Sequence, residues 1–313
     1  MAVRGDGLGS AGPASSAARL AATAIVPLAG FAAIGVAVAG GRGAIAGVAC
    51  AGVLLAAGYA YGDRLALSAM LARPVGEVEH PELYRLVREL SKTGRLPVPR
   101  LYLSPAEQPN AFAVGRSPRT ASVCCTQGLL SVLDEAELRG VLGHELAHVS
   151  GRDMLAATVS AGLATIITFP AGLGRFLPGR AASGSPAPAA SGSPAPRRAG
   201  SSGLGPLEAS LMLVLGPIAA LVIRLSVTRA RECRADAAGA MLSGDPAALA
   251  TALRKVDAGA EELALAPDGR LTSVGHLMIA CPFRPDGFAR LFLTHPPAGE
   301  RVRRLEALAG YRR

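Results

Sequence analysis

Apolar residues in this chain form two patterns: long uncharged runs, and shorter stretches with helical or strand periodicity. Two uncharged runs, residues 20–41 and 43–62, are separated only by Arg42. Each has the roughly 20 residues that a helix needs to cross a bilayer about 30 Å thick. We therefore expect a transmembrane hairpin at residues 20–62, after a disordered segment at residues 1–19 that is rich in Gly, Ala and Ser. A cleaved signal peptide is the alternative for the first run, but that run exceeds a typical apolar signal core and a second run follows closely.

Two further uncharged runs occupy residues 154–174 and 209–223. They are candidates for a third and a fourth membrane helix, with re-entrant, interfacial or domain-packed helices as the alternatives. The Pro-, Ser-, Ala- and Gly-rich stretch between them, residues 175–208, is typical of a linker. Its several arginines oppose a simple crossing to the outside under the positive-inside rule.

The rest of the chain, residues 63–153 and 224–313, has the periodicity of a globular domain in two parts. Residues 81–92 place apolar side chains on one helical face. Short strands are expected at residues 100–103, 111–114 and 121–125, and further helices at residues 134–151, at residues 224–242, after Asp245-Pro246 and from Gly299. The predicted fold class is α+β, mainly α, with a small β-sheet attached to transmembrane helices.

Composition and charge favour a membrane protein. Mean hydropathy is +0.35 although only 4% of residues are aromatic, so small and aliphatic residues suited to packing between membrane helices dominate. The net charge of +9 is nearly all arginine. No nucleic-acid motif accompanies this charge, so we expect a lipid bilayer and no nucleic acid as partner. The five cysteines have no paired spacing, which predicts reduced thiols and no Cys-based zinc site.

The distribution of arginines also predicts an orientation. Arg4 and Arg19 precede the hairpin, and Arg64 and Arg73 follow it. The positive-inside rule then places the N-terminus and the following domain on the cytoplasmic side. We expect a multi-pass protein of the cell membrane whose globular domain faces the cytoplasm.

The strongest chemical signal is the run His144-Glu145-Leu146-Ala147-His148. Positions i and i+4 of a helix share a face, so both imidazoles can bind one Zn²⁺ ion, and Glu145 can reach a water molecule at that ion. The pattern is short and has this meaning only on a helix. A capping-box-like start at Asp134 and Glu137, followed by apolar residues at helical spacing up to Gly151, predicts that helix.

Catalytic zinc generally has three protein ligands, so a third one must come from elsewhere in the chain. In the elongated H-E-x-x-H-x-x-G-x-x-H signature the third histidine would fall at Met154, which cannot replace it. Glu232 is the better candidate, because Asp236 lies one helical turn further on. One carboxylate can bind the metal while the other accepts the N–H of a ligand histidine and sets its tautomer. The alternative is a solvated helix whose acids pair with Arg229, Arg231 and Arg234.

Several separated segments resemble the HtpX-type membrane zinc metalloproteases, which are glutamate-liganded zincins related to the type 1 CAAX prenyl proteases. The similarity rests on Pro109–Gly115, Gly128–Leu130 with Asp134-Glu135, Leu138–Val141, His144–His148 with Asp153, Arg231-Glu232 with Ala235-Asp236, and His295-Pro296-Pro297 with Arg301. The hairpin before these segments and the two apolar runs between the ligands also match that family's layout. The resemblance implies a gluzincin-like fold and a zinc-dependent endopeptidase.

The resemblance also implies a set of site residues. One Zn²⁺ ion per chain would be bound by His144, His148 and Glu232, with Glu145 as general base and with Asp236 and Asp153 as supporting carboxylates. His295 and Arg301 would stabilise the oxyanion or hold the substrate. The strand residues that would pair with an extended substrate peptide are Asn110, Ala111, Phe112 and Ala113.

Protein or peptide substrates are expected, and the resemblance implies quality control of membrane proteins. A CAAX-type prenyl-peptide protease would use the same ligands, but it encloses its chamber with more membrane helices than the four candidates here. A non-catalytic membrane adaptor with structural zinc is a further alternative. It is disfavoured because structural zinc usually has four protein ligands. Neither the oligomeric state nor any regulatory partner follows from the sequence.

Overall fold

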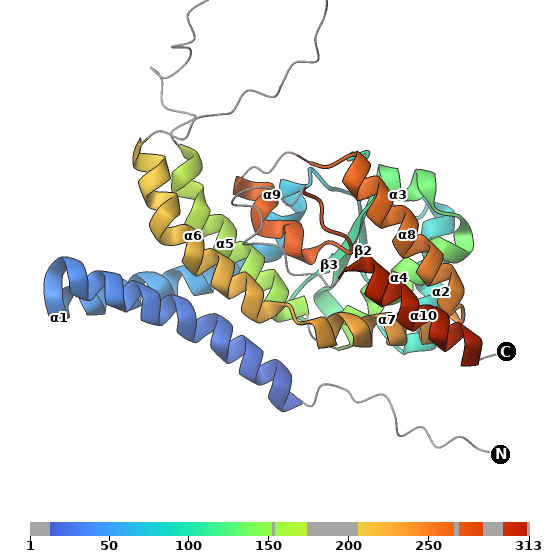
Figure 1. The fold of residues 1–313 in the computed structure, drawn as a ribbon, viewed down its shortest axis with the longest axis horizontal. Coiled ribbons are helices and arrows are strands. Elements are labelled where there is room, and N and C mark those ends of the chain that lie inside the picture. The colour runs from blue at the N-terminus through green and yellow to red at the C-terminus, as the bar shows by residue number, and fades with distance from the viewer. Residues whose placement is uncertain (1–12, 152–153, 174–205, 266–268, 284–296, 312–313) are drawn as a thin grey trace, which may run out of the picture.

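The computed structural model describes residues 13–151, 154–173, 206–265, 269–283 and 297–311. It is mainly helical with one four-stranded sheet, which confirms the predicted fold class. Three apolar helices lie on one side of the molecule, and the sheet and the remaining helices lie on the other (Figure 1). Residues 175–205 of the predicted linker lie outside the described residues, as do residues 1–12 of the predicted disordered segment.

The first apolar helix, α1 (Pro13–Ala69), folds back on itself (Figure 1). Its helical backbone is interrupted at Ala39 and at Gly40, where φ is +60° and ψ is −144°. Glycine adopts this backbone conformation at little cost because it has no Cβ atom. Residues 13–19, predicted to be disordered, form the first turns of α1, since their alanines favour a helix.

The segment Leu20–Ala69 is long and apolar enough to cross a membrane by length and composition. Many of its apolar side chains are exposed, among them Ile25, Val36, Ile45 and Val53. In water such a surface is unfavourable, whereas lipid chains can cover it. The two separate crossings expected for residues 20–62 stay a prediction.

Two more apolar helices, α5 (Met154–Leu173) and α6 (Pro206–Ser226), pack against α1 (Figure 1). Gly62 of α1 meets Gly162 of α5 so closely that a Cβ atom on Gly162 would lie 2.7 Å from the Gly62 Cα atom. Small residues thus allow the backbones to touch, as is common between membrane helices. The membrane crossings expected at residues 154–174 and 209–223 stay predictions.

The sheet has the strand order β1-β2-β4-β3. Strands β2 (Arg100–Ser104) and β4 (Ser122–Thr126) are parallel, while β1 (Arg73–Pro74) and β3 (Ala111–Val114) are antiparallel to their neighbours. The predicted strands differ from β2, β3 and β4 by at most one residue at either end, and the two-residue β1 was not predicted. Because β3 has only one strand neighbour, its other side forms an edge of the sheet.

The main core lies between this sheet and the helices of the globular domain. These helices are α2 (Pro81–Gly94), α3 (Gln127–Val132), α4 (Glu135–Ser150), α7 (Arg229–Ser243), α8 (Pro246–Glu262), α9 (Gly269–Val274) and α10 (Ala298–Tyr311), with 3₁₀ turns η1 (Pro118–Thr120) and η3 (Gly275–Leu277). The helix α4 is packed between α2, α7 and α8, so most of its surface is buried. The functional residues on α4 are therefore held by the core itself.

Candidate metal centre

The helix α4 begins with a reciprocal capping interaction. The Glu137 backbone N–H donates to Asp134 Oδ1 over 2.9 Å, and the Asp134 N–H donates to Glu137 Oε2 over 3.0 Å. Lys255 of α8 also donates to Glu137 Oε2, over 2.7 Å. These bonds satisfy two backbone donors that have no partner inside the helix. The predicted start of this helix at Asp134 is confirmed.

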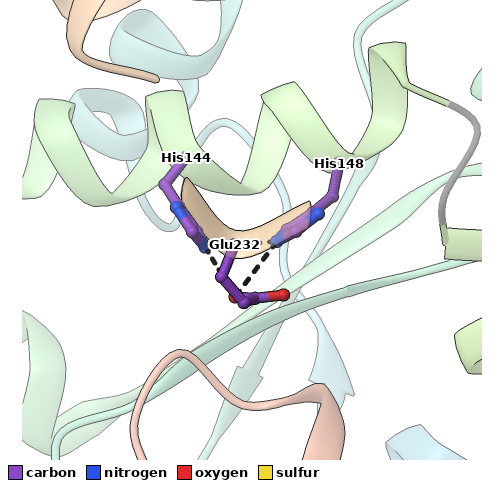
Figure 2. A group of neighbouring side chains, drawn as sticks. All are labelled: His144, His148 and Glu232. Atoms are coloured by element: carbon purple, nitrogen blue, oxygen red, sulfur yellow. Dashed lines mark hydrogen bonds and ion pairs between the residues drawn. The ribbon is translucent and has the colours of Figure 1, made fainter. Parts of the chain in front are cut away.

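Two histidines of α4 point the same way and meet a glutamate of α7 (Figure 2). The Nε2 atoms of His144 and His148 are 3.2 Å apart, and Glu232 Oε2 lies 3.8 Å from each of them. His144 and Glu232 are almost completely buried, while the His148 side chain is 12% exposed. The structure thus brings together the three residues that we expected to bind zinc.

A pair of glycines sets the distance between α4 and α7. A Cβ atom on Gly239 would lie 2.6 Å from the His144 backbone nitrogen, and one on Gly143 would lie 2.8 Å from the Gly239 carbonyl oxygen. Neither distance leaves room for a side chain, so the helices approach backbone to backbone. Our sequence analysis missed both glycines. The only signal in the sequence was their position: Gly143 directly precedes His144, and Gly239 lies about one helical turn after Asp236.

Asp236 orients one of the histidines. Its Oδ1 atom lies 3.0 Å from His144 Nδ1, as predicted for a supporting carboxylate. A proton on Nδ1 leaves the Nε2 lone pair free to face the metal position. Burial alone would raise the pKa of the Asp236 carboxyl group, but the charge and hydrogen bonds of Arg301 hold it below its usual range. Asp236 is therefore a carboxylate at neutral pH.

Arg301 of α10 lies behind Asp236. Its Nε and Nη2 atoms donate to the two Asp236 oxygens over 2.8 and 2.7 Å, and Nη1 donates to the Ile279 carbonyl oxygen over 2.8 Å. Burial lowers the pKa of the Arg301 guanidinium, but the Asp236 charge more than offsets this effect and raises it. We expected Arg301 to stabilise the oxyanion or hold the substrate. In this geometry its donors are directed at Asp236 and Ile279, which favours a supporting role.

Arg231 binds the carboxylate of its sequence neighbour Glu232. Arg231 Nε and Nη2 lie 3.1 and 3.0 Å from Glu232 Oε1, and Nη1 donates to the Ser226 carbonyl oxygen over 2.9 Å. Two hydrogen bonds therefore hold the Oε1 atom, and the Oε2 atom faces the histidines. Pairing with these arginines was our alternative to metal binding. In the structure Arg231 pairs with Oε1 while Oε2 lies 3.8 Å from both histidines, so pairing with this arginine is compatible with metal binding through the other oxygen.

Glu145 lies beside these groups and is almost completely buried. Among the described residues, its Oε2 atom has no hydrogen-bond partner. Burial raises the pKa of the Glu145 carboxyl group to about 7, against the lowering effect of the neighbouring His144. A buried carboxyl oxygen without a partner is unfavourable in a fold that only has to be stable. This position therefore suits a group that handles a proton.

These residues fit a divalent metal ion. With the proton of His144 on Nδ1, the lone pair on its Nε2 faces His148 Nε2, and Glu232 adds negative charge beside them. Burial also lowers the pKa of the His148 imidazole well below its usual value, so this ring is neutral. Two imidazole nitrogens and one carboxylate oxygen form a donor set typical of catalytic zinc.

The predicted substrate strand is only partly open at its edge. Asn110 bonds toward β4, because its carbonyl oxygen accepts from Thr126 N–H over 3.0 Å, and alternation then directs Ala111 and Ala113 to the outer edge. Ile279 N–H donates to the Ala111 carbonyl oxygen over 3.0 Å, and the Asn110 side chain donates to the Ala280 carbonyl oxygen over 3.0 Å. Among the described residues, none pairs with Ala113 on this edge. Ala113 is thus the residue of β3 whose outward backbone groups have no partner among the described residues, although the residue itself is buried. Phe112 packs its side chain into a buried cluster.

Two predicted site residues, Asp153 and His295, lie outside the described residues. Their expected roles, a supporting carboxylate and an oxyanion or substrate contact, stay predictions.

Comparisons with known proteins agree with this geometry. The profile of peptidase family M48 matches residues 77–309, which include every residue of the candidate centre. A protease HtpX homologue of Kineococcus radiotolerans is 51% identical over 262 residues, which cover 83% of this chain and 85% of that protein. A protease HtpX homologue of Paenarthrobacter aurescens is 47% identical over 253 residues, 81% of each chain. One of Bifidobacterium longum is 44% identical over 251 residues, 80% of this chain and 78% of that protein.

Proposed function

The chain belongs to peptidase family M48 and is a membrane-bound metalloprotease, and we propose that His144, His148 and Glu232 hold its catalytic zinc ion. The observation that carries this assignment is the convergence of these three ligand atoms within 4.8 Å of one another. A zinc ion held by three protein ligands keeps one position open, as catalysis requires. Structural zinc would need a fourth protein ligand. Among the described residues, the cluster of possible ligands contains only His144, His148 and Glu232.

Glu145 is the general base of the proposed reaction. Zinc at this site would supply a Lewis acid that polarises the scissile carbonyl and acidifies a water molecule. The free Glu145 Oε2 takes a proton from the attacking water and delivers it to the nitrogen of the leaving amine. Arg231 holds Glu232 Oε1 and Asp236 holds His144 Nδ1, so both ligands keep their orientation through the reaction.

The substrate peptide pairs with the edge of β3 in this proposal. Ala113 offers its N–H and C=O groups on the open edge, and main-chain hydrogen bonds there would hold an extended segment with little dependence on its sequence. Ala111 cannot offer its carbonyl oxygen to the substrate, because this oxygen already accepts a hydrogen bond from the Ile279 N–H. The pairing with β3 is therefore short. We propose Ala113 as the main backbone contact of the substrate.

The finer cellular assignment rests on sequence and charge. Arg64 and Arg73 follow the hairpin, while only Arg42 lies near its turn. The positive-inside rule then favours a multi-pass topology with the globular domain in the cytoplasm. There the enzyme would act in quality control on membrane proteins.

The substitution Glu145→Gln tests the assignment. It keeps the shape of the side chain but removes the base, so purified protein in detergent should still bind one equivalent of zinc. Its cleavage of an unstructured protein should fall by about 10²-fold or more. The matched control is Glu135→Gln, which removes one exposed carboxylate from the first turn of the same helix and should leave the cleavage rate unchanged.

Zinc removal completes this test. Chelation should abolish cleavage by the wild type, and added zinc should restore it. Retained, zinc-dependent cleavage by Glu145→Gln would contradict the role of Glu145, and wild-type cleavage that survives chelation would contradict the zinc assignment.

A further inference from the structure

The end of the sheet nearest the hairpin carries three arginines that have no acidic partner among the described residues. Arg116 and Arg119 belong to the β3–β4 connection, residues 115–121. Arg100 begins β2, and its N–H donates to the Ala121 carbonyl oxygen over 3.0 Å. All three residues are exposed, and no described carboxylate lies within ion-pair distance of them. We call Arg100, Arg116 and Arg119 the basic sheet end.

This lack of partners is unlike the surface around α2. There, Arg88 pairs with Glu77 and Arg139 pairs with Glu89, each over 2.6 Å. By contrast, residues 95–100 and 115–121 contain no Asp or Glu. The chain therefore leaves a local excess of positive charge at the basic sheet end, which complements an anionic surface.

The basic sheet end lies at the height expected for lipid headgroups. The second arm of α1 begins after Gly40, and at 1.5 Å per residue it reaches about 30 Å, the thickness of the hydrocarbon core, near Tyr59 and Tyr61. These tyrosines are 50% and 54% exposed, as is typical of the membrane interface. The Arg116 guanidinium carbon lies 5.5 Å from the centre of the Tyr59 ring. The β3–β4 connection is therefore level with the tyrosines.

This connection is also joined to the proposed substrate strand. The Gly115 N–H, directly after β3, donates to Thr158 Oγ1 of α5 over 3.0 Å. Thr158 in turn packs against α1, since a Cβ atom on Gly62 would lie 2.5 Å from the Thr158 carbonyl oxygen. Gly115 has a φ of +148°, which side-chain-bearing residues rarely adopt. The open rung at Ala113 is thus two residues from the point where β3 contacts the apolar helices.

We propose that the basic sheet end binds the phosphate groups of anionic phospholipids and so holds the open edge of β3 at a set height above the bilayer. The inference rests on the proposed function in one respect, the location of the hairpin in the membrane. Each arginine near an anionic lipid surface strengthens binding roughly fivefold. Three arginines on one sheet end suit a shared, phosphate-rich surface better than a single acidic residue.

The position of the connection can be measured with a single reporter, because the chain contains no tryptophan. Ser117→Trp places one in the β3–β4 connection, and Thr251→Trp on the exposed face of α8 is its control. In vesicles of phosphatidylcholine brominated near the headgroup, we expect strong quenching at position 117 and little at position 251. Equal quenching at the two positions would overturn the proposal.

Lipid preference is measured by native mass spectrometry. The full chain is mixed with equal amounts of phosphatidylglycerol and phosphatidylcholine, and the spectra show which lipid stays bound to it. Wild type should retain mainly phosphatidylglycerol, and the triple variant R100Q/R116Q/R119Q should lose this preference by about tenfold or more. The matched control R85Q/R88Q/R303Q removes the same number of positive charges from exposed positions of α2 and α10. It should keep the preference for phosphatidylglycerol. An unchanged preference in the first variant, or an equal loss in both, would contradict the proposal.

Cleavage of an unstructured protein in neutral detergent separates this inference from the proposed function. Wild type and R100Q/R116Q/R119Q should cleave equally well there, because the arginines lie outside the metal centre. If wild type binds phosphatidylglycerol selectively but does not cleave, the catalytic proposal fails and the lipid site stands. If it cleaves without lipid preference, the lipid site alone is contradicted.

Discussion

The two halves of the metal centre are positioned in different ways. On α4, two histidines share a face because they are one helical turn apart, and capping at Asp134 starts the helix. On α7, Glu232 reaches the same point only because the helices touch at Gly143 and Gly239 and because Arg231 turns its carboxylate. The α4 half thus depends on local geometry, and the α7 half on packing. Substitutions can separate the two.

The largest effect is expected from Gly239→Ala. The added methyl group would meet the backbone of His144 at 2.6 Å, so one helix has to move and Glu232 moves with it. We expect zinc affinity to fall by about 10²-fold or more, a loss at the upper end of that seen on removing a supporting group. Stability should fall by roughly 1–3 kcal/mol, as overpacking predicts. Chelator competition and thermal unfolding in detergent measure the two quantities.

The control for this substitution is Gly310→Ala in α10, where an added Cβ atom meets nothing within 4 Å. It should leave zinc affinity unchanged and, as a helical Gly→Ala change, should not lower stability. If Gly239→Ala matched this control in zinc affinity, the close helix contact would not position Glu232.

A smaller effect is expected from Arg231→Gln, which removes the two hydrogen bonds to Glu232 Oε1. The carboxylate can then rotate or bind the metal through both oxygens, so zinc affinity should fall by about 10- to 100-fold. Absorption spectra of the cobalt-substituted protein should change as well, because they report coordination number. Arg229→Gln, an exposed position two residues earlier on α7, is the matched control. The same cobalt spectrum in wild type and Arg231→Gln would contradict the idea that Arg231 fixes the orientation of the Glu232 carboxylate.

The smallest effect is expected from Asp134→Ala, which removes the N-cap of α4. Loss of such a cap costs about 1 kcal/mol of stability. Because the core holds α4 along most of its length, the two histidines should stay one turn apart and zinc affinity should not change. Thermal unfolding and chelator competition on the same sample test both statements. A tenfold loss of zinc affinity would show that the position of the two histidines also depends on the capped N-terminus of α4.

The sequence predicted much of the fold and most of the centre. The strands, the helix that begins after Asp134 and the convergence of His144, His148 and Glu232 agree with the structure. What it missed involves contacts between distant segments, such as the Gly143–Gly239 contact and the closure of the β3 edge by Ile279. Periodicity reports which face of an element is buried, but it does not report what that face touches.

Arg301 illustrates the same limit. Its resemblance to a family motif suggested a contact with substrate, whereas the structure directs its donors to Asp236. Residue type predicted a strong hydrogen-bond donor near the centre, and only the packing of α10 against α7 decided which acceptor it meets. The same holds for Arg231, whose acceptor is one particular oxygen of Glu232.

By itself, the sequence determined the chemistry of this protein: a two-histidine helix with a central glutamate, a second helix with Glu232 and Asp236, and apolar segments long enough for a membrane. These properties depend on residue type and on spacing within one element, where helix geometry is known in advance. The tertiary structure decided which carboxylate oxygen faces the histidines, how closely α4 and α7 approach, and which rung of β3 stays open. Those outcomes depend on contacts between elements far apart in the chain, and no local pattern encodes such distances.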